Sequence, residues 1–416
     1  MSQLILNQEA MPAAPVAGKA VVNIDSADSG RVKAVYPDGH LDILSPIGYR
    51  DRNMLLNGEF QYAQRQAPGT LTSYATGNAR VYGFDRWAMG IQTSSLQCQV
   101  QDNAGTPISS LNARFNGAFK QITAAGKFAI MQVLEGFDSV PLQGRTVRFQ
   151  FKAWTISSPT TPVYIRFGLL YLTAAGTVDV LPTTLFSAWG ANGTDPTPGT
   201  NLAFISPVLV DPLGNCTIQN NGQPGVISAA ALTTVPQRFS ATFQIPSTVL
   251  NVIPVIWTNN QFGVNDILYV SEAGLYAGSE VRDWYPRDRS TEFDLLERYY
   301  WKSFALATAP AQNVGAATGA LTGPVTVAGA TALAWRLSVR FPRRLRVAPS
   351  AAVTGITTYS PNAATAQPAD LTVPVAMTAV STSDNTEDGV NVTATGGAGG
   401  AVGDAGAVHM TVDVDI

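Results

Sequence analysis

Hydrophobic and polar side chains alternate along several stretches in the middle of the chain. Residues 147–153, 163–169 and 238–245 place apolar side chains at every second position, with mostly polar side chains between them. This period is typical of antiparallel strands that bury one face. Further strands are predicted at 82–89, 96–101, 129–135, 252–257 and 267–276. About eight such strands, joined by turn-rich segments, indicate a jelly-roll or a similar β-sandwich.

The same alternation recurs towards both ends of the chain. Residues 17–45 are strand-like and contain a Ser-Gly pair at 29–30 and an Asp-Gly pair at 38–39, which predict tight hairpins. So small a unit buries little apolar area alone, and we expect it to pack against a partner chain or a neighbouring copy. Residues 335–341 and 410–416 also alternate, which predicts a second, smaller β-sandwich.

One amphipathic helix is predicted, over residues 290–302. Ser290 or Thr291 can cap its first turn, and Phe293 and Leu296 fall on one face of it. We interpret this helix as a strut that docks one domain on the next.

Together these patterns predict an all-β chain of three units. Residues 1–50 form an N-terminal hairpin segment, residues 51–304 form a central jelly-roll β-sandwich closed by the short helix, and residues 305–416 form a small C-terminal β-sandwich. The Gly-, Asn- and Pro-rich stretch 187–201 is an excursion from the jelly-roll framework.

Composition and charge exclude several classes of protein. Only 13% of the 416 residues are charged, against about 25% in an average globular chain. The net charge of −3 argues against a general nucleic-acid binder, which carries a basic excess. No stretch is predicted to enter a membrane, because the longest uncharged one is broken by prolines and glycines.

The chain also offers few residues for catalysis or metal binding. Its two histidines are His40 and His409, and its two cysteines, Cys98 and Cys216, show no zinc-type spacing. One disulfide and two free buried thiols fit this cysteine count equally well. No metalloprotease, nucleophile-elbow, P-loop or Rossmann motif is present. The sequence therefore predicts a structural or binding protein and not an enzyme.

Short motifs in a fixed order resemble a known group of proteins. The segments are NGEF at 57–60, QR at 64–65, FDRW at 84–87, ERYYWKSF at 297–304 and FPRRLR at 341–346. Their order resembles the jelly-roll module, terminal helix and following small β-domain of bacteriophage tail-fibre and related virion proteins. The Glu-Arg start of the 297–304 segment and the excursion at 187–201 depart from that pattern.

This resemblance implies a non-enzymatic fibre or spike protein on the surface of a virion or phage-like particle, made in the bacterial cytoplasm. Residues 1–50 would attach it to other virion proteins, and the sandwiches would be displayed as a homotrimer for contact with the host. The module is also similar to carbohydrate-binding modules, which implies a host surface polysaccharide as ligand. Two alternatives stay open: a purely structural head-fibre, decoration or adaptor protein, and a capsule depolymerase with a carboxylate pair assembled from distant strands.

Sugar recognition requires an aromatic face with amide or carboxylate groups beside it. Trp189, Asn192 and Asp195 in the excursion supply such a set, and Tyr359 and Asn362 supply a second one in the C-terminal unit. A different interpretation of Trp189 is that it packs under its own loop or at a subunit interface.

The resemblance also implies a structural calcium ion between the first and last jelly-roll strands, with Glu59 and Glu272 as the matching carboxylates. Calcium takes six to eight oxygen ligands, and no dense acidic loop surrounds either residue. No other cofactor is predicted. A group of arginines, at 336, 340, 343, 344 and 346, could form a surface that binds nucleic acid or an anionic glycan. Their positions on an outward strand face and around a proline turn also fit simple exposure to solvent.

Overall fold

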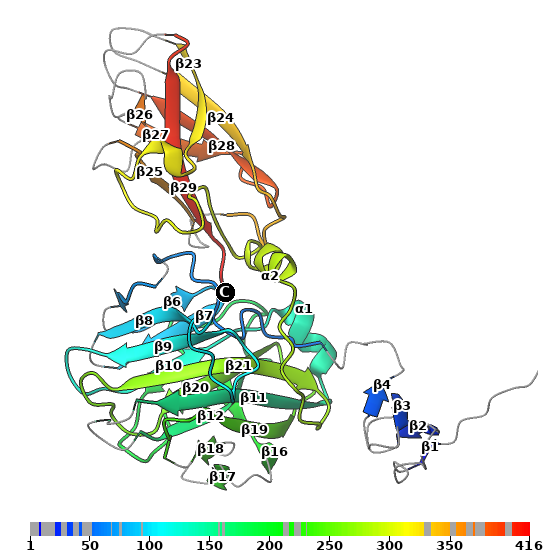
Figure 1. Cartoon of the computed structure of the whole chain (residues 1–416). Helices are drawn as coiled ribbons and strands as arrows, with labels where there is room; N and C mark the ends of the chain where they lie inside the picture. The colour runs from blue at the N-terminus through cyan, green and yellow to red at the C-terminus, as the bar shows by residue number, and fades with distance from the viewer. Residues whose placement is uncertain are drawn as a thin grey trace, which may run out of the picture.

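The fold is described by a computed structural model and is nearly all β (Figure 1). The described residues are 8–9, 21–25, 31–35, 41–43, 52–67, 69–74, 77–92, 95–156, 159, 163–210, 216–219, 226–229, 231–327, 334–349, 355–362, 369–370, 379–395 and 402–416. The predicted all-β class is confirmed.

A small sheet forms near the N-terminus. Its strands are β1 (Gln8–Glu9), β2 (Val21–Asp25), β3 (Arg31–Val35) and β4 (Leu41–Ile43). They pair in chain order, and β2, β3 and β4 are antiparallel as the hairpin pattern predicts. The turn pairs at 29–30 and 38–39 lie outside the described residues.

Two facing sheets make the central jelly-roll (Figure 1). The first has the order β17-β18-β12-β20-β10-β7-β6, with β15 paired to β12. Its strands are β6 (Gly77–Phe84), β7 (Trp87–Ile91), β10 (Phe128–Met131), β12 (Ile165–Leu172), β15 (Leu202–Ile205), β17 (Cys216–Gln219), β18 (Val226–Ala229) and β20 (Asn251–Thr258).

The second sheet has the order β16-β19-β11-β21-β9-β8-β5. Its strands are β5 (Thr72–Tyr74), β8 (Leu96–Asp102), β9 (Phe115–Gln121), β11 (Thr146–Thr155), β16 (Pro207–Val210), β19 (Gln237–Gln244) and β21 (Ile267–Ala277). One-turn helices α1 (Gly136–Ser139) and η1 (Val140–Leu142) precede β11.

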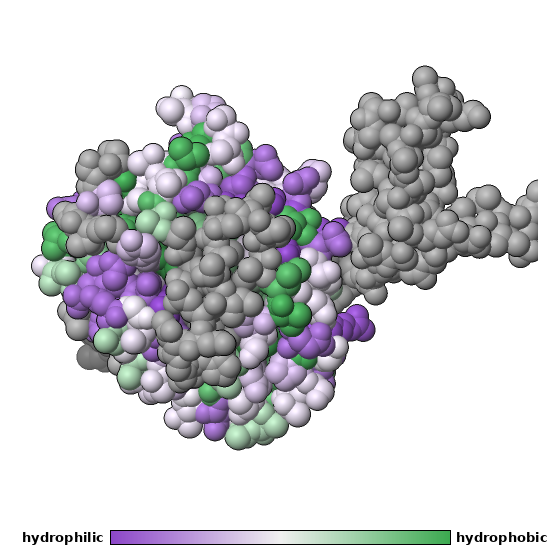
Figure 2. Space-filling model, turned by 90° about the horizontal axis from the view of Figure 1, so that it is seen from below, coloured by the Kyte–Doolittle hydropathy of each residue, from purple (hydrophilic) through white to green (hydrophobic). Residues whose placement is uncertain are grey.

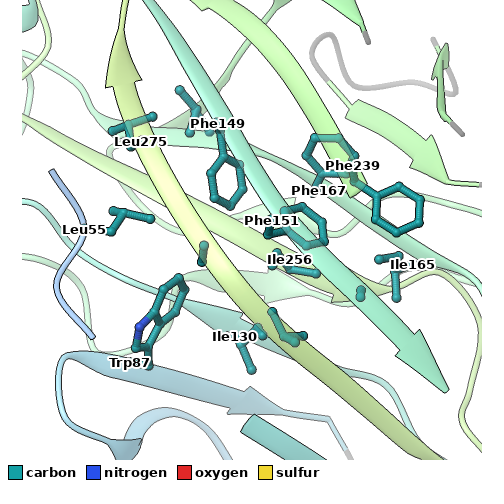
Figure 3. Close-up of a cluster of buried hydrophobic side chains, with 14 of the residues drawn as sticks. Leu55, Trp87, Ile130, Phe149, Phe151, Ile165, Phe167, Phe239, Ile256 and Leu275 are labelled. Carbon is teal, nitrogen blue, oxygen red and sulfur yellow. The ribbon is translucent and has the colours of Figure 1, made fainter. Parts of the chain in front are cut away.

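The alternating apolar residues of both sheets fill the space between them (Figure 3). Phe149 and Phe151 of β11 meet Phe167 of β12 with ring centroids 6.0 and 5.1 Å apart. Because every second side chain of a strand points to the same face, the period-two pattern in the sequence places these rings in one core.

A second hydrophobic cluster lies outside that core. The excursion, which contains the short strands β13 (Phe186–Ala188) and β14 (Thr197–Pro198), packs Phe186 and Trp189 with Trp257 of β20. Ile416 joins the same cluster. The excursion therefore covers part of the first sheet with apolar side chains.

Several sequence predictions need correction. The strand predicted at 129–135 ends at Met131, and the strand predicted at 410–416 ends at Asp413. Residues 82–89 are not one strand: β6 ends at Phe84 and β7 begins at Trp87, because Asp85 and Arg86 form a turn in which Arg86 has φ +68°. The helix predicted at 290–302 is shorter.

The helix, α2, spans Arg289–Leu296, and residues 300–302 form strand β22 instead (Tyr300–Lys302). They are extended because their backbone pairs with β29 (Ala405–Asp413). The cap is Asp288, whose carboxylate accepts the backbone N–H of Ser290 and of Thr291 at 3.1 Å each; neither of those residues is the cap.

The C-terminal unit is one hydrogen-bonded sheet with a sandwich-like arrangement. β29 pairs with β22 and β25 over one half and with β23 and β26 over the other, and β23 continues through β24 and β28 to β27. The remaining strands are β23 (Leu321–Val327), β24 (Ala334–Arg340), β25 (Ile356–Tyr359), β26 (Ala369–Asp370), β27 (Ala379–Ser383) and β28 (Gly389–Thr395). Trp335 lies in its core, and its indole N–H donates to the Gly323 carbonyl at 2.6 Å.

The two sandwiches are held together by one chain connection and by noncovalent contacts of the last residues. The chain enters the C-terminal sheet through β22 and returns along β29, so that residue 416 lies between the sandwiches (Figure 1). Beside it, Arg65 and Arg86 of the jelly-roll form ion pairs with Asp415, at 2.7 and 2.5 Å. The helix and this return strand together fix the C-terminal sandwich on the jelly-roll.

On the face that Figure 2 shows, hydrophobic residues form small patches between hydrophilic residues. In the part of the chain that the structure describes, no helix is both long and apolar enough to cross a bilayer.

The two cysteines do not share a disulfide, since Cys98 is a free, fully buried thiol in β8. Burial raises the pKa of this thiol to about 12. Because the thiolate is the reactive species, we expect Cys98 not to react with a disulfide reagent in the native protein. The measurement is thiol titration of a Cys216→Ser variant, native and in concentrated guanidinium chloride. Rapid reaction of the native variant would contradict the burial.

Candidate functional site

The excursion residues predicted to bind sugar are mainly engaged in packing. Trp189 is 6% exposed, and its ring meets Phe186 edge-on with centroids 5.3 Å apart. Asp195 forms a buried ion pair with Arg166, and burial raises the pKa of Asp195 although Arg166 opposes the shift. Asn192 is exposed, and its side-chain oxygen accepts the backbone N–H of residue 261 at 3.2 Å. The indole thus lies under its own loop, and sugar binding by this set stays a prediction.

The second predicted set lies at the end of β25, where its aromatic ring packs on another ring. Tyr359 ends β25 half-buried, with its ring edge-on to Phe304 at 5.3 Å. Asn362 follows after a bend and accepts a long hydrogen bond from the Ser360 hydroxyl at 3.5 Å. Sugar binding here also stays a prediction.

The two glutamates predicted to hold calcium both contact the segment before β9. Glu272 accepts the backbone N–H of Asn112 and of Ala113 and pairs with the Lys152 ammonium at 2.9 Å. Glu59 accepts the next two backbone N–H groups, those of Arg114 and Phe115. The Lys152 ammonium balances the charge of Glu272. Among the described residues, no three His, Cys, Asp or Glu side chains gather as a metal site, and the calcium site stays a prediction.

A pocket that the sequence did not indicate lies beside Glu59. It has a volume of about 640 Å³ and is formed by the segment before β5 and the segment that leads into α2. Its lining residues are Arg52, Asn53, Leu55, Asn57, Gly58, Glu59, Gln61, Tyr62, Trp284, Tyr285, Arg287 and Glu292. We call it the aromatic pocket, because Trp284 forms part of its wall and the Tyr285 ring is 80% exposed.

Asn57 holds the first of these segments in shape. It adopts φ +53°, and its side-chain amide donates to the carbonyls of Tyr62 (2.7 Å) and Asp85 (3.0 Å). The next residue must be glycine, because a Cβ on Gly58 would lie 2.2 Å from the Ala273 carbonyl oxygen and 2.6 Å from the Trp284 ring. Trp284 can pack here only because residue 58 has no side chain.

The charged groups of the aromatic pocket are partly paired. Arg287 forms an ion pair with Glu292 and donates to the Asn53 carbonyl at 2.8 Å. Glu292 also accepts the backbone N–H of Asn57. Burial raises the pKa of Glu59, with a smaller contribution from the charge of Glu292, while the two N–H groups it accepts act in the opposite direction. The two carboxylates therefore differ in environment within one pocket.

A second pocket of about 560 Å³ adjoins the first, and Gln61 and Tyr62 line both. The side-chain amide of Gln61 has a partner for each of its two polar atoms. Its nitrogen donates to the Glu59 carboxylate (3.1 Å), and its oxygen accepts from the Arg289 guanidinium (2.7 Å). The other lining residues are Ala63, Gly69, Gln99, Val100, Gln101, Asp102, Asn103, Phe115, Arg289 and Leu306. We call it the amide pocket, and we refer to the two neighbouring pockets, which share the side chains of Gln61 and Tyr62, as the groove.

Comparisons with known proteins give only remote likenesses. No protein-family model and no curated protein sequence matches the chain. Among similar solved structures is the enzymatically active domain of tailspike protein 4 of bacteriophage CBA120, at TM-score 0.28 and 9% identity over 54% of this chain and 21% of that one. Another is the C-terminal family 22 carbohydrate-binding module of Xyn10B from Clostridium thermocellum, at TM-score 0.27 and 12% identity over 49% of this chain and 99% of that one. A putative sugar-binding protein from Bacteroides thetaiotaomicron has TM-score 0.29 and 7% identity over 55% of this chain and 100% of that one. Likenesses at these scores do not identify a function.

Proposed function

We propose that this protein is a fibre or spike component of a phage or phage-like particle and that its jelly-roll binds a host surface glycan in the groove. The observation that carries the glycan part is the Tyr285 ring, 80% exposed at a pocket lined by Trp284 and several polar side chains. Because this ring lies at the edge of a pocket, it offers a flat apolar face to a ligand that enters the pocket.

The chemistry of the groove suits a sugar. The apolar C–H face of a sugar ring packs on an aromatic ring, while planar polar groups hydrogen-bond its hydroxyls. The aromatic pocket offers Tyr285 for the first role, with Glu59 and Gln61 for the second. Its volume of about 640 Å³ lies within the range of roughly 300–1,000 Å³ found for small-molecule sites.

The amide pocket extends the site. Gln99, Gln101 and Asn103 bring side-chain amides to it, and Phe115 adds an aromatic ring. Because the two pockets share Gln61 and Tyr62, a ligand that fills both must be a chain of sugar units. We therefore propose an oligosaccharide segment of a polysaccharide as the ligand.

The virion part of the proposal is supported by the order of sequence motifs from 57–60 to 341–346. In this proposal residues 1–50 attach the protein to the particle, the protein assembles as a homotrimer, and the sandwiches are displayed on the particle surface. Co-purification of a fusion of residues 1–50 with the particle tests the attachment.

Tyr285→Ala is expected to weaken glycan binding about tenfold, which corresponds to roughly 1.4 kcal/mol and is the size expected for loss of one stacking ring. The labelled full chain is first screened on an array of bacterial polysaccharides, and dissociation constants are then measured for the glycans that it retains. Tyr164→Ala is the matched control, since Tyr164 is another exposed tyrosine, 37% exposed, and lines neither pocket.

Three outcomes separate the alternatives. Equal affinity of Tyr285→Ala and Tyr164→Ala would move the site away from the groove. Absence of any glycan binding by a folded wild-type oligomer would favour a purely structural role. Release of reducing ends from a bound glycan would support a depolymerase, for which Glu59 and Glu292 supply the two carboxylates that glycoside hydrolysis needs.

A further inference from the structure

A third pocket, away from the groove, gathers arginines that are far apart in the sequence. It has a volume of about 670 Å³ and lies between α2 and the segment that follows β24. Its lining residues are Thr291, Asp294, Leu295, Arg298, Arg343, Arg344, Leu345, Arg346 and Glu387. We call it the arginine pocket. Three of these arginines, at 343, 344 and 346, belong to the set that the sequence offered as a surface for an anionic ligand, and Arg298 joins them only in the folded chain.

The charge of the lining is positive. Four guanidinium groups and two carboxylates line the pocket, which leaves a formal charge of +2. Arg343 pairs with Asp294 and Arg344 pairs with Glu387, and the two arginine side chains are 52% and 72% exposed. Ion pairs as exposed as these are weak because solvent screens them, so an incoming anion can displace or share them at little cost.

The backbone holds the arginines in position. The N–H of Arg346 donates to the Arg298 carbonyl beyond the end of α2, and the N–H of Leu345 donates to the Glu387 carbonyl before β28, both at 2.8 Å. The Arg346 guanidinium donates to the Val414 carbonyl at 2.9 Å. The segment is thus fixed on both sides, which lowers the conformational entropy lost when a ligand binds.

One nearby acid is only partly ionised at neutral pH. Burial raises the pKa of Glu297, at the end of α2, to about 7, and the charge of Asp294 contributes to the shift, while Arg343 opposes it. The cationic character of the pocket is therefore retained at neutral pH despite this carboxyl group.

We propose that the arginine pocket binds a phosphate group. A planar guanidinium presents two N–H donors at the spacing of two phosphate oxygens, and several arginines around one cavity suit a tetrahedral dianion. Two sources carry this group: free inorganic phosphate and a phosphorylated sugar. The site is separate from the groove proposed for glycan binding, so each can fail without the other.

The test is calorimetric titration of the full chain with inorganic phosphate at low ionic strength. Replacing both Arg343 and Arg344 by Gln is expected to weaken phosphate binding about tenfold or more, the loss of roughly 1.4 kcal/mol or more that accompanies removal of charge-assisted hydrogen bonds. The matched control replaces Arg336 and Arg340 by Gln. These are exposed arginines of β24 that lie outside the pocket, and their removal changes the net charge equally.

The outcomes are distinct. Saturable binding that only the Arg343 and Arg344 substitutions weaken supports the proposal. Absence of saturable phosphate binding, an equal loss in both double variants, or equal binding of acetate at matched ionic strength overturns it. Glucose 6-phosphate is titrated beside phosphate, with glucose as control. Tighter binding of glucose 6-phosphate than of inorganic phosphate identifies a phosphorylated saccharide as the ligand. Equal binding of the two identifies phosphate alone, and the phosphate group is recognised in either case.

Discussion

Arg86→Ala is expected to lower the free energy of unfolding by about 3–5 kcal/mol, the cost of breaking a buried ion pair from one side. Arg86 is 3% exposed, donates to Asp415 at 2.5 Å and to the Val133 carbonyl, and lies 3.7 Å above the Tyr299 ring. The substitution leaves a buried carboxylate and a buried carbonyl without this donor. Urea unfolding followed together by tryptophan fluorescence and circular dichroism measures the loss.

The matched control is Arg114→Ala. Arg114 also forms an ion pair, with Asp102 at 2.6 Å, but both side chains are largely exposed. Solvent screens such a pair, so its loss is expected to change the free energy of unfolding far less than the loss of Arg86. If both substitutions cost the same, burial does not determine the strength of these ion pairs and the argument from Arg86 is wrong.

Acid should reduce the effect of Arg86→Ala. Burial acts to raise the pKa of Asp415, but Arg86 and Arg65 outweigh burial and hold that pKa below its usual range. A carboxyl group whose pKa is lowered in the folded state stabilises the protein fully when the pH is above the pKa of the unfolded state, about 3.9. This contribution is lost as the pH falls through the pKa of the folded state. The difference between wild type and variant is therefore expected to be largest near neutral pH and to shrink in acid.

Phe60→Ala is expected to cost a similar amount, about 3–5 kcal/mol, as for other buried phenylalanines truncated to alanine. Phe60 is fully buried, and its ring lies between Phe84, Trp87 and Phe119 at centroid distances of 5.1, 4.8 and 5.8 Å. Its φ of +58° is held by this packing. Urea unfolding measures the loss.

Phe60→Ala should also weaken glycan binding while the protein is still folded, because Phe60 anchors the segment from Asn57 to Tyr62 that lines the groove. Phe137→Ala is the control for stability: that ring is 84% exposed, and surface substitutions change stability by about 0.5 kcal/mol or less. A cost near that of the control would show that the Phe60 ring is not part of the core.

The strands were predictable where apolar and polar side chains alternate, although the polar face of β11 is buried too, with Arg148 and Gln150 only 2% and 3% exposed. Residues 147–153 lie within strand β11, as the alternation of their side chains predicts. The turn inside 82–89 was not predictable, because Asp85 and Arg86 lack the glycine or proline that marks most tight turns. Distant contacts fix this turn: Asn57 donates to the Asp85 carbonyl, and the Asp85 side chain accepts the N–H of Gln64.

The groove was not predictable because its two walls are more than 200 residues apart. Tyr285 lies in an irregular stretch with no periodic pattern, which gives no signal for exposure or burial. The walls meet only because the first segment is hydrogen-bonded to the backbone of β21, just before the chain turns towards α2. The Met54 N–H donates to β21 and the Gly58 carbonyl accepts from β21, with N···O distances of 2.9 and 2.8 Å. The excursion had the right residue types for a sugar site, but its aromatic side chains face the sheet that it covers.

The junction between the sandwiches has a mechanical consequence. A domain joined by one linker alone swings freely, and a pull on it straightens the linker without loading the fold. Here a force that draws the C-terminal sandwich away from the jelly-roll loads β22 and the end of β29 together, since these strands pair side by side at the junction. The ion pairs of Asp415 with Arg65 and Arg86 share that load. Tension is therefore transmitted directly from one sandwich to the other. The angle between the two sandwiches is kept until the pairing of β22 with β29 and the ion pairs of Asp415 break.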